Sequence, residues 1–394
     1  VRRRDRERRT RAVINNLCRP AHRPAPNIYA GELPDMMPAL LADLRAVART
    51  SQHVAIYIAN GHGAWEAANS NLLSPGDHAL ALVTGRFGEG WCAAARAIGV
   101  EVETIDFGRR SPADPDRLEA ALRADTRGRI RAVLVTHVDT ATSVRSDIAA
   151  LRRAIDASGH PALLAVDAIA SLGCEPIEMD AWGIDVLVSA SQKGLMTPPG
   201  LGFLWISEKA RRSRSATPSP YWDWTPRIAA SEFWQYFCGT APTHHLYGLR
   251  EALTMLLHEE GLETAWARHE ILARSVWAAL DAWGAAPGAG IAANIPDPRH
   301  RAHCVTSVRI TPPDGTRLRA LLESEYGITL GIGLGMADPA LPDWHGFFRI
   351  GHMGHVNAHM LLGTLAGMDA GLKALGIRHG AGALDAATGC IAGK

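Results

Sequence analysis

The sequence predicts an α/β fold, in which a mainly parallel β-sheet is covered by helices on both faces, followed by a smaller α+β unit. Three observations predict it. Short apolar runs alternate with amphipathic stretches from about residue 53, their spacing is that of β–α–β units, and the pattern changes after about residue 243. The chain of 394 residues is long enough for about two or three domains.

The expected strands of the large sheet are a series of short apolar runs. They are HVAIYIAN (53–60), HALALVTG (78–85), VEVETIDF (100–107), RAVLVTHVD (131–139), ALLAVDAIAS (162–171), DVLVSASQK (185–193) and GLGFLWIS. Helices are expected between them, including 64–73, the stretch closed by Gly99, SPADPDRLEAALRA, and 148–159. Ligands of such sheets bind beyond the carboxyl ends of the strands, so we expect a site there.

The second part begins with a long helical region, which we expect to be two helices broken near Gly261. Strands at 303–310 and 347–354 and helices at 316–327 and 357–376 then predict an α+β domain. We therefore divide the chain into a disordered or atypical N-terminal segment (1–35), a large domain (36–245), and a long helix with a small C-terminal domain (246–394).

The composition favours small-molecule partners. The net charge of +1 gives no general attraction to nucleic acid or to anionic lipid, and no run of about 18 apolar residues predicts a membrane span. The six cysteines form no CxxC pair, which argues against a zinc site and favours buried thiols in a reducing cytoplasm. We expect no metal and a cytoplasmic location.

The start of the chain is rich in arginine. The first eleven residues contain Arg2, Arg3, Arg4, Arg6, Arg8, Arg9 and Arg11, with no apolar stretch behind them, so they are not a secretory signal. We interpret them as a disordered tail or a misassigned start. A nucleic-acid-binding arm is the alternative, and it predicts salt-sensitive DNA binding that is lost when residues 1–11 are removed.

Lys193 is the first candidate for chemistry. Only four of the 41 lysine and arginine residues are lysines, and this one follows an apolar strand directly, beside Gln192, in a loop rich in glycine and proline. An amine held there is partly desolvated, which lowers its pKa and makes it a nucleophile for a carbonyl. The alternative is a surface lysine at the end of a strand.

Asp167 is the second candidate, because it ends an otherwise apolar strand. A lone carboxylate is costly to bury without a partner, and a protonated heterocycle nitrogen would be one. A carboxylate in that place keeps a pyridine ring electron-accepting. The alternatives, an Asp that caps the next turn or pairs with an arginine, are about equally plausible from this residue alone.

Three weaker signals complete a site. NGHGAWEAA (60–68) begins a helix after a strand, and the backbone N–H groups of such a turn bind phosphate, although a plain tight turn is the alternative. Phe87 is placed to stack on a planar ring, or to pack in the core. Arg349, in an apolar strand, is placed to bind a substrate carboxylate through paired hydrogen bonds, or to form an internal salt bridge.

Together with these candidate residues, the rest of the sequence resembles a known family over roughly residues 53 to 380. It is similar to the class V aminotransferases of the aspartate-aminotransferase fold, specifically the alanine–glyoxylate and serine–glyoxylate aminotransferases. The resemblance is most specific in AVDAIASLGCEPIEMDAWGIDVLVSASQKGLMTPPGLGF, and GTAPTHHLYGLREAL and RIGHMG also match. It implies a large domain with a mainly parallel seven-stranded sheet, a smaller C-terminal α+β domain, and pyridoxal 5′-phosphate as the cofactor.

The resemblance also implies a role for each matching residue. Lys193 would hold the cofactor covalently and later move the substrate proton, Asp167 would hold the pyridine nitrogen, and Phe87 would cover the ring. Gly61, His62, Gly63 and Gln192 would form the phosphate site. Thr240 would reach the phosphate of a neighbouring subunit, which implies a homodimer with shared sites. Arg349 would bind the substrate carboxylate.

Three positions depart from the family pattern. Ala141 replaces a serine that usually lies near the cofactor, so that hydrogen bond is lost or moves to Thr140. Phe237 stands where relatives often have a phosphate-binding tyrosine, although Tyr236 is adjacent. The usual N-terminal Pro-Gly-Pro-Thr segment has no counterpart in residues 1–35.

We therefore expect a transaminase that moves an amino group from serine or alanine to glyoxylate or pyruvate by ping-pong kinetics. Two alternatives use the same cofactor: pyridoxamine–pyruvate transfer, or a lyase-type or desulfurase reaction. A desulfurase needs a reactive cysteine on a mobile loop, whereas Cys304 lies in an apolar strand. A catalytically silent binding protein with the same fold is an alternative of another class.

Overall fold

The computed structural model describes residues 26–215 and 219–393. A seven-stranded sheet has the order β1-β9-β8-β7-β4-β2-β3. Its strands are β1 (His53–Ala59), β2 (His78–Val83), β3 (Glu101–Asp106), β4 (Ile130–Thr136), β7 (Leu163–Asp167), β8 (Val186–Ala190) and β9 (Gly200–Ile206). Only β9 runs against the others, because it pairs antiparallel with both β1 and β8. The carboxyl ends of the remaining strands therefore share one edge of the sheet, as the sequence predicts.

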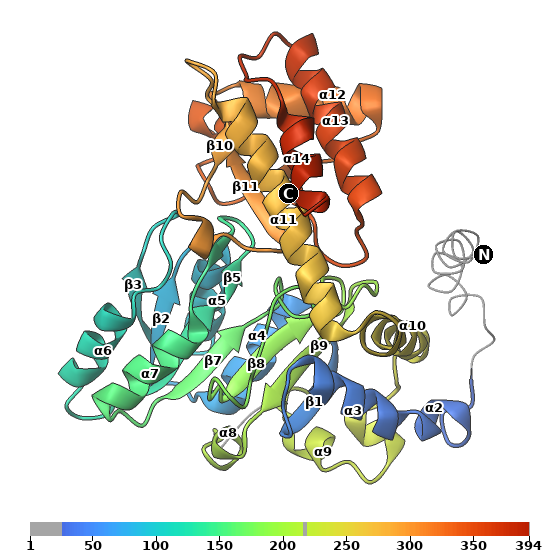
Figure 1. Cartoon of the computed structure of the whole chain (residues 1–394). Helices are drawn as coiled ribbons and strands as arrows, with labels where there is room; N and C mark the ends of the chain where they lie inside the picture. Colours follow the sequence, from blue (N-terminus) through green and yellow to red (C-terminus); the bar gives the residue numbers. More distant parts are fainter. Residues whose placement is uncertain (1–25, 216–218, 394) are drawn as a thin grey trace.

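Helices cover both faces of this sheet (Figure 1). They are α2 (Glu32–Asp35), α3 (Met37–Val47), α4 (Gly61–Leu72), α5 (Arg86–Ala97), α6 (Pro115–Ala124), α7 (Ile148–Ser158), α8 (Glu208–Arg212), α9 (Thr225–Ile228) and α10 (Thr243–Leu253). A short hairpin, β5 (Val138–Asp139) and β6 (Val144–Arg145), and the 3₁₀-helix η2 (Phe233–Phe237) complete this part.

The two faces of the sheet bury two separate cores, because side chains alternate along each strand. In β7, Leu164 and Val166 join the core formed with α3, α6, α7 and α10. Leu163 and Ala165 join the opposite core, formed with α4 and α5. Asp167 has the same parity as Leu163 and Ala165, so its side chain emerges on the face that α4 covers.

The second part is built on a four-stranded sheet of order β10-β11-β13-β12. It contains the π-helix η3 (Thr254–Glu260), α11 (Leu262–Gly284), β10 (Ala292–Ala293), η4 (Pro298–His300), β11 (Val305–Arg309), α12 (Asp314–Tyr326), β12 (Gly331–Ile332), η5 (Pro342–Gly346), β13 (Phe347–Gly351), α13 (Ala358–Ala374) and α14 (Ala383–Ile391). Its apolar residues form a core of their own. In Figure 1, α11 runs from the large sheet region up into this second part.

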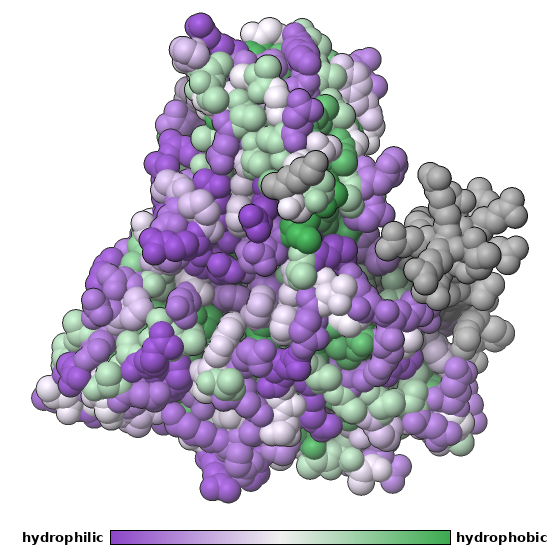
Figure 2. Space-filling view, in the orientation of Figure 1, coloured by the Kyte–Doolittle hydropathy of each residue, from purple (hydrophilic) through white to green (hydrophobic). Residues whose placement is uncertain are grey.

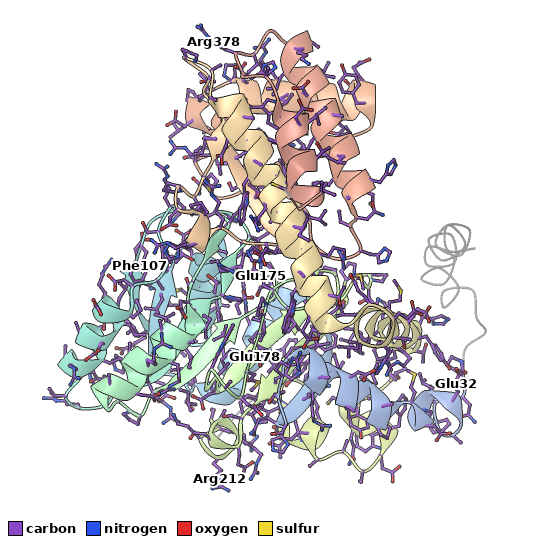
Figure 3. All side chains as sticks on the ribbon, viewed as in Figure 1. Glu32, Phe107, Glu175, Glu178, Arg212 and Arg378 are labelled. Carbon is purple, nitrogen blue, oxygen red and sulfur yellow. The ribbon has the colours of Figure 1, made fainter. Side chains whose placement is uncertain are left out.

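The two parts meet across buried polar contacts. Glu175, labelled in Figure 3 where the parts join, accepts hydrogen bonds from the His303 backbone N–H at 2.8 Å and from Nη1 of Arg145 at 3.2 Å. The face seen in Figure 2 is mostly hydrophilic, with apolar residues in small groups, one of them beside α11. No helix in the described ranges is long and apolar enough to cross a membrane.

Most predicted elements agree with the structure to within a few residues, including the helix break at Gly261. Helices α2, α3, α8, α9 and α14 were not predicted. The arginine-rich stretch 2–11 and Cys18 lie outside the described residues, as does most of the predicted N-terminal segment, of which residues 26–35 contain the short helix α2. The domain boundaries at 35/36 and 245/246 and the cytoplasmic location stay predictions.

Candidate active site

A cavity of about 260 Å³ lies at the carboxyl ends of the strands. The residues that line it come from the turn after β1 and the start of α4, from α5, from the β5–β6 hairpin, from the end of β7, and from the loops after β7 and β8. They are Asn60, Gly61, His62, Trp65, Phe87, Val138, Thr140, Asp167, Ile169, Ala170, Gln192 and Lys193. Residues far apart in the sequence therefore meet at the edge where a parallel sheet places its ligand.

Asp167 forms the polar end of this cavity and is only 3% exposed. Its Oδ2 accepts a hydrogen bond from Nε1 of Trp65 at 3.0 Å, and its Oδ1 accepts one from the Ile169 backbone N–H at 2.7 Å. Burial raises the pKa of the carboxyl to about 7, against the effect of these two donors. No cationic side chain among the described residues lies within ion-pair distance, so the carboxylate lacks a counter-ion.

Lys193 lies on the same cavity, in the loop that follows β8. Burial lowers the pKa of its amine, and the positive charge of Arg349 lowers it further, whereas the charge of Asp167 acts in the opposite direction. The amine therefore has more of its neutral, nucleophilic form at neutral pH than an exposed lysine would have. Lys193 and Asp167 line the same cavity, and each shifts the pKa of the other toward the charged form.

The backbone N–H groups at the start of α4 lie at the edge of the cavity. Asn60 is its N-cap residue, and its Oδ1 accepts hydrogen bonds from the N–H of His62 at 3.0 Å and of Gly63 at 3.3 Å. A Cβ atom at Gly61 would lie 2.6 Å from Cδ1 of Ile169, so a larger residue there would require the Ile169 side chain to move. Gly61 and His62 line the cavity, whereas Gly63 does not.

Two apolar side chains border the cavity from different elements: Phe87 at the start of α5, and Ile169 after β7. The start of α5 is held by the buried carboxylate of Asp139, whose Oδ2 accepts from the N–H of Phe87 at 2.8 Å and of Gly88 at 3.2 Å. Its Oδ1 accepts from the N–H of Ala141 at 3.0 Å. Asp139 therefore holds the start of α5, which carries Phe87, against the loop that contains Thr140.

Arg349 lies on β13 of the smaller sheet and reaches toward the cavity. Its Nη1 donates to the carbonyl of Thr140 at 3.1 Å, and its Nε donates to the carbonyl of Ile332 at 2.8 Å. Within the described ranges no carboxylate lies within ion-pair distance, so the internal salt bridge considered as the alternative is not formed. Burial lowers the pKa of the guanidinium. Nη2 makes neither of these bonds and is left for another acceptor.

The remaining predicted residues are distributed as follows. Thr140 and Gln192 line the cavity, whereas Ala141 is buried behind it. Thr240 is exposed, in the segment between η2 and α10, and does not line the cavity. Phe237 is buried in the core.

Sequence reasoning missed five lining residues: Asn60, Trp65, Val138, Ile169 and Ala170. The sequence contains a signal for two of these residues. Asn60 is a favoured N-cap residue directly before a helix, and Trp65 stands four positions after Gly61, one helical turn farther along α4. Ile169 and Ala170 follow β7 in an irregular segment, where the alternation of a strand no longer predicts which way a side chain points.

The cavity fits pyridoxal phosphate on three observations of this structure. Asp167 has no cation within ion-pair distance in the described part of the chain, and a protonated ring nitrogen would supply one. The side-chain Oε1 of Gln192 is buried and has no hydrogen-bond partner within residues 26–215 and 219–393. A half-turn of the amide would present its N–H₂ group to a phosphate. Gly61 leaves the space that a Cβ would fill at the helix N-terminus, where anions bind. Lys193 would then provide the covalent link.

Comparison with known proteins agrees with this interpretation of the cavity. The family model described as "Aminotransferase class-V" matches residues 37–359. The chain is 36% identical to a serine–glyoxylate aminotransferase of Methylorubrum extorquens, over 88% of this chain and 85% of that protein. It is 36% identical to an L-aspartate–glyoxylate aminotransferase of Paracoccus denitrificans, over 86% and 83%. The crystal structure of a pyridoxamine–pyruvate aminotransferase from Mesorhizobium loti superimposes with a TM-score of 0.83 at 25% identity, covering 96% of this chain and 94% of that one.

Proposed function

This chain belongs to the class V aminotransferase family, whose cofactor is pyridoxal phosphate, and from that premise we propose that it transfers the amino group of serine or alanine to glyoxylate or pyruvate. Two relatives that differ in their amino donor, serine in one and aspartate in the other, both have glyoxylate in their names. Glyoxylate is therefore the acceptor that the relatives favour most.

One observation carries the proposal. Lys193 and Asp167 line a single cavity, and Arg349, which has no ion-pair partner among the described residues, contacts Thr140 at the edge of the same cavity. An amine, a carboxylate without a counter-ion and a guanidinium are the three charged groups that an amino-group transfer with this cofactor needs. Their convergence supports catalysis over a silent binding protein.

When bound, pyridoxal phosphate supplies an aldehyde for the amino group and a ring that withdraws electrons from the substrate's Cα. The chain's own groups do the rest. Asp167 holds positive charge at the ring nitrogen. Nζ of Lys193, with a lowered pKa, accepts the proton released from Cα and later gives it up, as general base and then general acid. Arg349 binds the substrate carboxylate and so fixes which side of Cα faces Lys193.

The phosphate site and the ring faces are assigned on the same basis. Gly61, His62, Gly63 and Gln192 are proposed to bind the phosphate, although Gly63 acts only through its backbone. Phe87 and Ile169 are proposed to pack on the ring. With Ala141 unable to donate, the hydroxyl of Thr140 is proposed to make the hydrogen bond that a serine makes in relatives.

We also propose a homodimer with shared sites. Thr240 is exposed and lies outside its own chain's cavity, as a residue that serves a neighbouring subunit would. In η2, just before that segment, Trp234 is 58% exposed, a large apolar surface that a partner subunit would cover. Sedimentation of wild type beside Trp234→Glu tests this, with a monomeric variant expected.

A second candidate donor is pyridoxamine, because the Mesorhizobium loti enzyme of that activity shares the fold at a TM-score of 0.83. Free pyridoxamine has no carboxylate, so that reaction would not need Arg349 for its amino donor. The amino donor that the protein uses therefore distinguishes the two candidate functions.

The test is a screen of serine, alanine, aspartate and pyridoxamine against glyoxylate and pyruvate, with purified protein. We expect ping-pong kinetics with serine or alanine and glyoxylate, and no turnover by Lys193→Ala, which lacks the amine. The matched control is Lys373→Ala, which removes an exposed lysine near the end of α13, away from the cavity. Turnover only with pyridoxamine would favour the second candidate, and no spectral change with any donor would favour a silent binding protein.

A further inference from the structure

Trp65 touches three elements of the site at once. It lies on α4, is 1% exposed, and lines the cavity. Its ring packs edge-on against His62, with ring centroids 4.8 Å apart, and against Phe87 at 6.4 Å. Its Nε1 donates to Asp167 at 3.0 Å. One side chain therefore contacts the proposed phosphate turn, ring face and carboxylate.

The contact with Asp167 follows from the fold. Asp167 emerges on the sheet face that α4 covers, because it shares the parity of Leu163 and Ala165 in β7. The two donors bind different oxygens of the carboxylate: the Ile169 N–H holds Oδ1 and the Trp65 indole holds Oδ2. Two donors on two oxygens fix the plane of the carboxylate, whereas one donor would leave it free to turn about its χ2 bond.

The indole itself is held in place. It stacks almost parallel on Trp91, at 6.2 Å and an angle of 10°, and Nε1 of Trp91 donates to Oδ1 of buried Asn69 at 2.9 Å. A Cβ at Gly90 would lie 3.2 Å from the Trp65 ring, so glycine at that position keeps space for the indole. The direction of the N–H group is therefore set by packing before any ligand binds.

We propose that Trp65 is a positioning residue for the reaction: its indole N–H fixes the Asp167 carboxylate in the orientation that receives a protonated ring nitrogen, while its ring positions His62 and Phe87. This inference rests on the proposed function, because it assumes that the cofactor binds at Lys193. Trp65 acts through Asp167 and is not itself a catalytic residue.

The experiment compares Trp65→Phe with Trp205→Phe. Phenylalanine keeps an aromatic ring on α4 but removes the N–H donor. Trp205 is equally buried, and its Nε1 donates to the Leu44 carbonyl at 2.8 Å on the other face of the sheet, so this control loses a comparable hydrogen bond away from the site. We expect cofactor affinity of the cofactor-free protein to fall about tenfold in Trp65→Phe and less than twofold in Trp205→Phe.

A spectroscopic signal separates orientation from general destabilisation. With ¹⁵N-labelled pyridoxal phosphate, the ring nitrogen of wild type is expected to give the signal of a protonated nitrogen. Trp65→Phe should show a partly unprotonated signal, and Trp205→Phe should match wild type. If Trp65→Phe does not fold, β-(3-benzothienyl)alanine at position 65 keeps the indole shape with sulfur in place of N–H.

The outcomes are distinguishable. Weaker binding and a shifted ¹⁵N signal at position 65 alone would support the inference. Wild-type affinity and an unchanged ¹⁵N signal in Trp65→Phe, or in the isostere, would overturn it while leaving the proposed function intact. If wild type and Lys193→Ala bind the cofactor equally and without a visible band, it is the proposed function that fails.

Discussion

Two buried carboxylates at opposite ends of the same sheet differ in their surroundings. Asp185, just before the amino end of β8, is 5% exposed, and Nη1 of Arg152 and Nζ of Lys209 lie 3.8 and 3.7 Å from its Oδ2. Asp167, at the carboxyl end of β7, is 3% exposed and has no such cation among the described residues.

The difference separates a structural carboxylate from a ligand-binding one. A buried charge needs a partner, and the chain supplies two for Asp185. Among the residues that the structure describes, none lies within ion-pair distance of Asp167, and burial raises the pKa of its carboxyl to about 7. Asp167 is oriented by two N–H donors, has no counter-ion among the described residues and lines the cavity, so it is prepared for a cation that comes from outside the chain.

The largest effect is expected from Asp167→Asn. Asparagine keeps the size of the side chain but cannot hold positive charge at the ring nitrogen, so we expect kcat/KM to fall by about 10³-fold, about 4 kcal/mol. Steady-state kinetics with the best donor and acceptor of the screen measure this.

Asp185→Asn is the matched control at the other end of the sheet. It removes two long ion pairs, but Arg152 keeps Asp156 as a partner and Lys209 is 48% exposed, so we expect a loss of about 1 kcal/mol in the free energy of unfolding and activity within a few fold of wild type. Equal losses of activity in the two variants would contradict the distinction drawn between them.

The pH dependence of stability gives the next largest effect. In the cofactor-free protein the folded pKa of Asp167 lies near 7, above the unfolded value of 3.8, so the folded state holds a proton that the unfolded chain has released. The free energy of unfolding of wild type, relative to Asp167→Asn, should therefore fall by roughly 2 to 3 kcal/mol from pH 5 to pH 7.

Urea unfolding of both proteins at several pH values measures this difference. Saturating pyridoxal phosphate should abolish it, because a ring cation stabilises the ionised carboxylate. A difference that is independent of pH, or that persists with the cofactor bound, would mean that Asp167 already has a cationic partner.

A smaller effect is expected at the substrate-binding residue Arg349, whose guanidinium donates to two backbone carbonyls. Arg349→Gln removes the guanidinium, so we expect KM for the amino acid to rise about 30-fold, about 2 kcal/mol, with a smaller change in kcat. Arg309→Gln, on the neighbouring strand β11, is the control and should leave KM unchanged. Similar KM values in wild type, Arg349→Gln and Arg309→Gln would rule out a contact between Arg349 and the substrate carboxylate.

The smallest effect concerns two helix caps. Asn60→Ala and Asp147→Ala each remove an N-cap acceptor, from α4 and α7, and each should cost about 1 kcal/mol of stability without cofactor. With saturating pyridoxal phosphate the cost at Asn60 should disappear, since a phosphate takes over the N–H groups of the helix start, whereas the cost at Asp147 should remain. Thermal unfolding measures both, and a persistent cost at Asn60 would argue against a phosphate there.

The sequence by itself determined the alternation of strands and helices, the class V family, and the ends of the strands on which Lys193 and Asp167 stand. These features are readable because they depend on local periodicity and on short motifs. The tertiary structure decided that β9 runs antiparallel between β1 and β8, that Arg349 is held by the carbonyls of Thr140 and Ile332, and that Trp65 meets Asp167 across 102 positions. Such contacts depend on strand order and on which helix covers which face, and no local pattern in the chain encodes either.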